Sequence, residues 1–226
     1  MARRNQPMEP LAKEICEAVR QAANEWIRNV ELRDGVINGP DMDVPPGGFA
    51  SRVNFATALQ TKLQGRRVDL NVSRGLSQEV ASAWDAWASN FRMTLRGIYP
   101  SFAAVASPRA PRTQGQGTFP LSQGMSSGEM RLGAKELERR LLTGTRLNRS
   151  SEQAQVFAQV AEWIDSSFAA WKLQAQIDGT SQSGEGDTPV FPPFVPVGPV
   201  LAGDNLPVPG PIAAVVKGPQ FGLPIG

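Results

Sequence analysis

The sequence predicts a mainly α-helical protein: a body of four to five helices with long loops, followed by an extended C-terminal arm rich in proline and glycine. Apolar residues recur at steps of three and four along much of residues 1–178, which is the periodicity of amphipathic helices. Turn-forming clusters of glycine, proline, asparagine and aspartate interrupt this pattern. After residue 178, prolines and glycines become frequent enough to oppose both helix and sheet.

The first helix is predicted over residues 9–32, where apolar residues fall on one stripe. The next stretch, residues 33–48, contains Asp-Gly, Asn-Gly, Gly-Pro and Pro-Pro pairs. We expect it to be an irregular loop with a short hairpin at Asp34–Gly35. A second, shorter helix is predicted over residues 51–64, again from helical spacing. The stripe of the first helix comprises Leu11, Ile15, Val19, Ala22, Trp26 and Val30.

The third helix is predicted over residues 76–95, where three aromatic residues share one face. Residues 68–75 alternate apolar and polar side chains before it, so they could form a short strand or an extended lead into the helix, and we favour the lead. Residues 98–125 have no steady period and predict a long surface loop. The stripe of this helix comprises Val80, Ala83, Trp84, Trp87, Phe91 and Leu95.

Two more helices are predicted before the arm. Residues 126–144 begin with Ser126 and Glu129, which have the spacing of a capping box, and end at a glycine. Residues 151–176 are apolar over a broad arc, which predicts a helix that packs against more than one neighbour.

Composition divides the chain into a helical body (residues 1–178), a flexible linker (179–188) and an apolar proline-rich arm (189–226). The arm carries large apolar side chains between its prolines, so we expect it to be buried against another surface. That surface is either the arm's own body or a neighbouring subunit. We favour a neighbour, because an extended arm of about 35 residues spans roughly 100 Å. The residues predicted to bind the partner are Phe191, Phe194, Val195, Val197, Val200 and Leu201.

The absence of histidine removes several classes of enzyme from consideration. Ser-His-Asp and Cys-His catalysis, histidine general bases and the commonest zinc and haem ligands all need this residue. The only cysteine, Cys16, permits no internal disulfide, and we interpret it as a buried apolar residue. We therefore predict a protein that is not an enzyme, with no catalytic, cofactor-binding or metal-binding residues.

Two short motifs leave a catalytic alternative open. The string GMSSG, residues 124–128, matches the G-x-S-x-G elbow around Ser126, but no strand is predicted before it and no histidine can activate the serine. We favour a turn with a helix cap. Asp41 and Asp43 could bind a cation or serve as a carboxylate pair in glycoside hydrolysis. They lack the other ligands of a calcium loop, and we favour a solvated turn.

Charge is almost balanced, with 23 Lys and Arg against 21 Asp and Glu and a net charge of +2. A nucleic-acid binder usually has a larger or more concentrated excess. Small arginine clusters could still contact phosphates if the fold gathers them, so nucleic-acid binding or packaging is our second hypothesis. These clusters contain Arg3, Arg4, Arg66, Arg67, Arg139, Arg140, Arg146 and Arg149.

Two phrases, YPSFAAV at Tyr99–Val105 and FPPFVPVGPV at Phe191–Val200, resemble segments of uncharacterised structural proteins of phages and phage-tail-like particles. The resemblance covers about a tenth of the chain and includes no functional motif. It implies a non-enzymatic subunit of a large assembly whose partners are other protein subunits, like or unlike. The start of the chain predicts no signal peptide and no window predicts a membrane span, so we expect synthesis in the cytoplasm and a place in a virion or particle.

Overall fold

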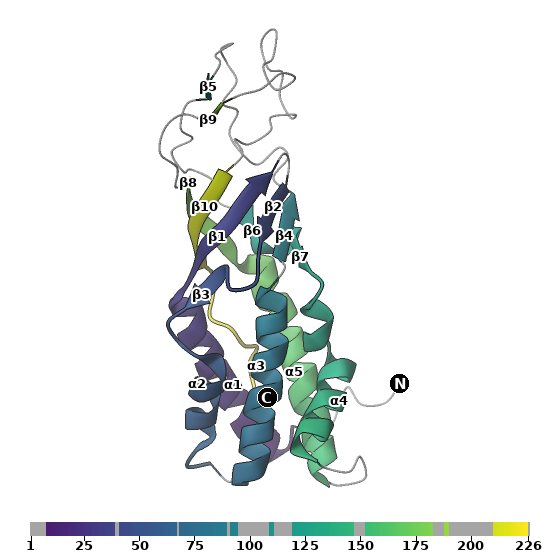
Figure 1. The fold of residues 1–226 in the computed structure, drawn as a ribbon. Coiled ribbons are helices and arrows are strands. Elements are labelled where there is room, and N and C mark those ends of the chain that lie inside the picture. The colour runs from purple at the N-terminus through teal and green to yellow at the C-terminus, as the bar shows by residue number, and fades with distance from the viewer. Residues whose placement is uncertain are drawn as a thin grey trace.

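A computed structural model describes residues 8–38, 41–66, 68–89, 91–94, 109–110, 119–146, 152–182, 188–189 and 210–225. These residues form a bundle of five α-helices with an antiparallel, barrel-like sheet at one end (Figure 1). The helices are α1 (Pro10–Arg28), α2 (Phe55–Leu63), α3 (Leu70–Ala88), α4 (Ala134–Thr145) and α5 (Glu152–Gln174).

The sheet has eight strands in the described part of the chain, in the order β6-β8-β10-β1-β2-β4-β7, with β3 paired to β1. Its two outer strands, β6 and β7, are joined by the short 3-10 helix η1 (Leu121–Gln123), so one tight connection links both ends of the curved sheet. The strands are β1 (Val30–Asn38), β2 (Asp41–Val44), β3 (Phe49–Ser51), β4 (Phe91–Thr94), β6 (Phe119–Pro120), β7 (Gly124–Ser126), β8 (Gln176–Gln182) and β10 (Gly210–Lys217).

The prediction of a mainly α-helical fold is wrong, because the helices share the molecule with this sheet. The strands are hidden in segments whose glycines and aspartates resemble loops. In β1, Leu32 pairs with Ala214 of β10 and Gly35 pairs with Ile212, so the register shifts at Arg33 and Asp34. Asp34 and Gly35 therefore lie at a β-bulge within a strand and do not form a hairpin turn. The hairpin between β1 and β2 turns after Asn38 instead.

The predicted third helix also ends earlier than its apolar pattern. Phe91 lies four residues after Trp87 and therefore fits the helical stripe, but α3 ends at Ala88 and Phe91 begins β4. The favoured prediction of an extended lead over residues 68–75 is wrong, because α3 already begins at Leu70. The Asp69 carboxylate caps the helix by accepting hydrogen bonds from the backbone N–H groups of Asn71 and Val72.

The predicted extended arm is also corrected where the structure describes it. Residues 210–217 form β10, a central strand between β1 and β8, and residues 218–225 run back along the helices (Figure 1). The predicted linker, residues 179–188, begins inside β8. The described C-terminal residues are therefore part of the folded body. The partner-binding residues predicted from the sequence, Phe191, Phe194, Val195, Val197, Val200 and Leu201, lie outside the described residues.

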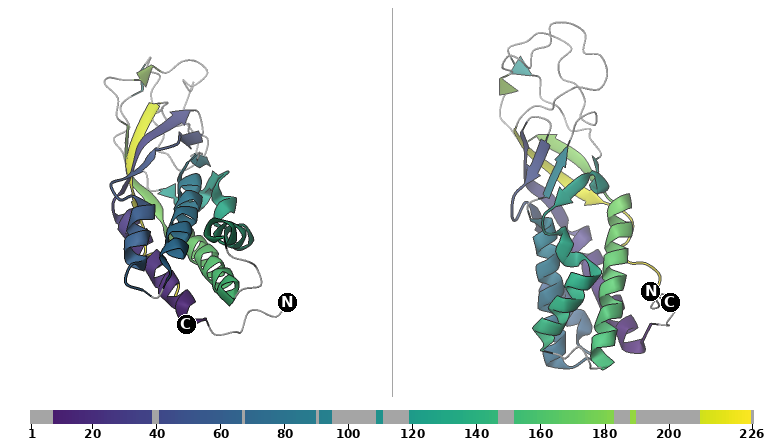
Figure 2. Two further views of the ribbon diagram at one scale, coloured as in Figure 1. Left: turned by 60° about the horizontal axis from the view of Figure 1, so that its bottom comes forward. Right: turned by 90° about the vertical axis from the view of Figure 1, so that its right-hand side faces the viewer.

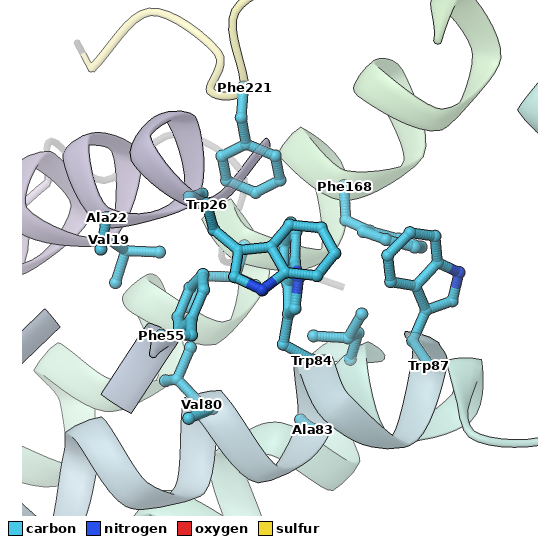
Figure 3. Packing of buried hydrophobic residues seen from close by; sticks show 14 of the residues in the cluster. Val19, Ala22, Trp26, Phe55, Val80, Ala83, Trp84, Trp87, Phe168 and Phe221 are labelled. Atoms are coloured by element: carbon cyan, nitrogen blue, oxygen red, sulfur yellow. The ribbon is translucent and has the colours of Figure 1, made fainter. Parts of the chain in front are cut away.

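Three helices run almost directly into strands: α1 into β1, α3 into β4 and α5 into β8. Each of them places a tryptophan in its last turn, namely Trp26, Trp87 and Trp171. The ring centroids of Trp26 and Trp87 lie 6.5 Å apart, and those of Trp87 and Trp171 lie 5.7 Å apart. These contacts form an aromatic junction between bundle and sheet, where edge-to-face packing stabilises the place at which each helix becomes a strand. Figure 3 shows Trp26 and Trp87 of this junction.

The C-terminal residues complete this junction. The fully buried Phe221 ring packs edge-on against Trp84, with 5.4 Å between ring centroids (Figure 3). The Asn24 side-chain amide holds the backbone of the same residue: Nδ2 donates to the Phe221 carbonyl at 3.0 Å, and Oδ1 accepts from the Phe221 N–H at 2.8 Å. A polar pair buried in this way satisfies groups that would otherwise be costly to bury.

Candidate docking end and neighbouring surface sites

Three connections between strands of the sheet, one short and two long, leave it at the same end. Because β2 is antiparallel to both β1 and β4, and β10 to both β1 and β8, the strands β1, β4 and β8 run in one direction, away from the helices. Their return strands are β2, β6 and β10. Residues 39–40, 95–118 and 183–209 therefore connect strands at the end of the sheet opposite to the helices, which we call the distal end.

The two longest connections contact each other. Strand β5 (Arg109–Ala110), in residues 95–118, pairs with β9 (Thr188–Pro189), in residues 183–209. This pair lies beyond the sheet on the side away from the helices (Figures 1 and 2). The phrases Tyr99–Val105 and Phe191–Val200 belong to these connections by sequence and themselves lie outside the described residues.

Sequence reasoning did not associate these two segments in space. They are almost a hundred residues apart, and only the strand order shows that their connections start from the same end of the sheet. A helix, a strand, a connection and a return strand follow one another three times, in α1–β1–β2, α3–β4–β6 and α5–β8–β10. This repeated order could have indicated that the connections share one end of the sheet.

Near the distal end, Asp41 and Asp43 face the same side of β2, as residues two apart on a strand do. Arg92, on the adjacent β4, pairs with both carboxylates: its Nε lies 2.9 Å from Asp43 Oδ1, and an Nη nitrogen lies 3.8 Å from Asp41 Oδ2. Thr94 Oγ1 also donates to Asp41 at 2.9 Å. The carboxylates are thus compensated by the chain's own side chains. Among the described residues, no group of three or more Cys, Asp or Glu side chains is placed to hold a metal ion.

The GMSSG motif forms a structural turn. Its first three residues form the short strand β7, and the 3-10 helix η1 lies directly before it, so no strand leads into the motif as a nucleophile elbow requires. Ser126 Oγ donates to the Ser89 carbonyl at 3.0 Å and accepts from the Gly128 N–H at 3.1 Å, so its hydroxyl links this turn to the end of α3. The predicted capping box is not formed. Glu129 binds Lys172 at 2.6 Å instead, and α4 begins at Ala134.

Two of the four cluster arginines that the structure describes, Arg139 and Arg140, are paired with acids. Arg139 forms two hydrogen bonds with Glu136, which lowers the pKa of that carboxyl, and Arg140 lies 2.7 Å from Glu79. These charges are compensated locally, which reduces the field available to a phosphate backbone. Arg3, Arg4, Arg67 and Arg149 lie outside the described residues.

Cys16 is fully buried on α1, as the sequence predicted. Burial raises the pKa of its thiol to about 12, so the reactive thiolate is almost absent at neutral pH. This side chain packs as a small apolar residue.

An open surface groove lies beside the distal half of α3, and sequence reasoning did not identify it. Its main part has a volume of about 440 Å³ and lies between the start of α2, strand β3 and the end of α3. A second part of about 420 Å³ continues toward Arg131. Asp85 borders both parts. Much of the Asp85 side chain is exposed, yet the groove walls desolvate the carboxyl and raise its pKa.

Asp85→Asn is therefore expected to stabilise the protein slightly at neutral pH. A raised pKa means that the folded state binds the proton more tightly than the unfolded state, so stability is highest below the ordinary aspartate pKa of about 4 and falls as the pH rises above it. The melting temperature of the variant should exceed that of the natural chain at pH 7, and the two should coincide near pH 3. A variant that is less stable at pH 7 would show that the charge has a partner.

Comparison with protein families, curated proteins and solved structures finds no match to this chain. None of the helices in the described part of the chain combines the length and the apolar character needed to cross a bilayer.

Proposed function

We propose that this chain is a non-enzymatic structural subunit of a larger protein assembly, which docks onto neighbouring subunits through its distal end. The observation that supports this most is the strand order, which brings both long connections to one end of a well-packed body. Connections longer than about 12–15 residues are uncommon in compact domains, and binding loops are one of their usual roles.

The composition of the two connections fits a docking role. Residues 183–209 contain the predicted partner-binding set Phe191, Phe194, Val195, Val197, Val200 and Leu201, and large apolar side chains at one end of a molecule favour burial against another protein. The two connections also have opposite charges. Residues 95–118 carry three arginines and no acid, whereas residues 183–209 carry three acids and no base. Opposite charges favour pairing of the first connection with the second, within one copy or between copies.

The body supplies a rigid base for such docking. One continuous hydrophobic core extends from the helices into the sheet, and the aromatic junction fixes the three strands that lead to the distal end. A base of this kind limits the conformational entropy that is lost when the connections bind.

The kind of particle is proposed from the sequence resemblance alone, which indicates a phage or phage-tail-like particle. Its partners would be other protein subunits, like or unlike. We favour the alternative of nucleic-acid binding less, because Arg139 and Arg140, two of the cluster arginines that the structure describes, form ion pairs with acids of the chain.

The test replaces four predicted partner-binding residues with serine: Phe191, Phe194, Val195 and Val197. We expect the mass of the full chain, measured by light scattering, to rise with concentration, and the mass of the variant to remain that of a single chain. The variant should also bind less of an apolar dye. The melting temperature should be unchanged, because the proposal assigns these side chains to docking and not to the folding of the body.

A matched control replaces exposed apolar residues of the helical region, Leu70, Met130 and Leu173, which are 57%, 75% and 70% exposed. This variant should associate like the natural chain. Docking between like copies would be contradicted if the natural chain stayed monomeric at high concentration. Docking through the distal end would be contradicted if the control lost association and the distal variant kept it.

A further inference from the structure

We propose that the C-terminal segment, residues 210–225, is exchanged between two copies of this chain, so that the segment of one copy fills the position that its own segment occupies here. This inference rests on the proposed function, because docking at the distal end brings two copies together. The partner is a second copy of this chain, and the contact consists of β10 and the tail that follows it, residues 218–225.

The position filled by this segment is a slot with two parts. The first part is a gap in the sheet: β10 pairs with β1 on one side, as in Glu31 with Val215, and with β8 on the other, as in Ile177 with Val216. A chain without β10 would expose two unpaired strand edges next to each other. Edges of this kind bind an added strand through its backbone.

The second part of the slot lies between α1 and α5 and binds the tail mainly through its backbone. Asn24 holds the N–H and the carbonyl of Phe221, as described above. Ser167 Oγ accepts from the Leu223 N–H at 3.1 Å, and Trp163 Nε1 donates to the Leu223 carbonyl at 3.3 Å. The buried Phe221 ring adds selectivity for this sequence. The slot is thus a peptide-binding site with four backbone contacts and one aromatic pocket.

The connection that leads to the segment is much longer than the fold needs. Strands β8 and β10 are antiparallel neighbours, with Gln182 paired to Ile212, and such neighbours are usually joined by about 2–5 residues. The β1–β2 hairpin of the same sheet follows this rule, since only residues 39–40 separate its strands. Residues 183–209 could instead span roughly 90 Å when extended. The segment can therefore reach the slot of a neighbouring copy.

Exchange makes the same contacts within one copy or between two, so their balance depends on proximity and on extra contacts. Docking at the distal end supplies both the proximity and the extra contacts. It places the start of one connection beside that of another copy, and it favours the arrangement in which the connections cross.

The test uses the full chain with Glu31→Cys and Val215→Cys, at partner positions of β1 and β10. Antiparallel partners lie about 4.5–5.5 Å apart at Cα, within the range that a disulfide spans. Val215 is 40% exposed, and the buried Cys16 should stay inert. After oxidation at high protein concentration, we expect covalent dimers or larger species on a non-reducing denaturing gel.

A matched control carries Asp43→Cys and Arg92→Cys, at partner positions of β2 and β4, which exchange of the C-terminal segment leaves in one chain. It should yield only intrachain links. A third variant adds to the Glu31 and Val215 pair a two-residue Asn-Gly turn in place of residues 183–209, which should permit only intrachain links.

Intrachain links alone in the first variant would overturn the exchange, even if light scattering showed association through the distal end. The absence of any link would also overturn it, because the inference needs Val215 beside Glu31 in every copy. Interchain links that persist in the short-turn variant would show that they arise from collision and would contradict exchange. Interchain links in the first variant only would support it.

Discussion

Phe221→Ala is expected to lower the free energy of unfolding by about 3–5 kcal/mol, which is the usual cost of truncating a buried phenylalanine. The ring is fully buried among three indoles, with centroid distances of 5.4 Å to Trp84, 6.1 Å to Trp163 and 6.4 Å to Trp171. Three large, packed rings cannot collapse into the space that the alanine leaves. Chemical denaturation of both proteins measures the difference, and the midpoint should fall without a change of slope.

The control for this prediction is Leu223→Ala, two residues further along the tail. Leu223 is 37% exposed and its tail contacts are made by the backbone, so its truncation should cost less than half as much. Equal costs for the two variants would mean that the tail does not insert its aromatic ring into the junction.

Gly128→Ala is the second substitution with a large expected effect. An added Cβ would lie 1.9 Å from the Ala86 carbonyl oxygen and 2.8 Å from the Trp87 nitrogen. Both are backbone atoms of α3, so no side chain can rotate away, and the turn after β7 must separate from the helix end. We expect a loss of about 3 kcal/mol, at the upper end of the usual cost of overpacking. Thermal and denaturant unfolding measure it.

Gly133→Ala is the matched substitution for Gly128→Ala. The backbone φ at Gly133 is −62°, and the nearest atom to an added Cβ, the Met130 carbonyl oxygen, is 3.2 Å away. A small movement accommodates the methyl group, so the loss should be under about 1 kcal/mol. A Gly128 variant as stable as this control would contradict the close approach of the turn to α3.

The helices could be predicted because their apolar spacing is local. Residues 9–32 predicted the first helix, and α1 spans Pro10–Arg28 with Ile15, Val19, Ala22 and Trp26 buried along it. The strands could not be predicted in the same way, because they depend on partners far away in sequence. Glu31 pairs with Val215, and a four-residue strand such as β4 continues the apolar pattern of the helix before it.

The candidate docking end also has a part that local sequence could indicate and a part that depends on distant strand pairing. The sequence singled out the apolar residues of Phe191–Val200 from composition, and that proposal stays a prediction. Composition could not show where the chain returns to the body. The strand β10 looked like the continuation of the arm, although the alternation of buried Ala214, exposed Val215 and buried Val216 is that of a half-buried strand. Truncation at Asp178, the predicted end of the helical body, would remove β10 and Phe221 from the folded body. Substitutions within residues 183–209 therefore test docking without removing these elements.

The architecture explains how the distal end can be adapted to docking without a change in the stability of the helices and the sheet. The tryptophans in the last turns of α1, α3 and α5 fix the bases of three strands, and the tail packs into the same junction. Changes in residues 95–118 or 183–209 are then expected to alter association and leave the stability of the body unchanged.

Hydrogen exchange of the full chain, compared between dilute and concentrated samples, tests the docking proposal most directly. On association, peptides from residues 95–118 and 183–209 should exchange more slowly, whereas peptides from α2 and α4 should be unchanged. Slower exchange confined to the helices, or none at concentrations where the mass increases, would contradict docking through the distal end.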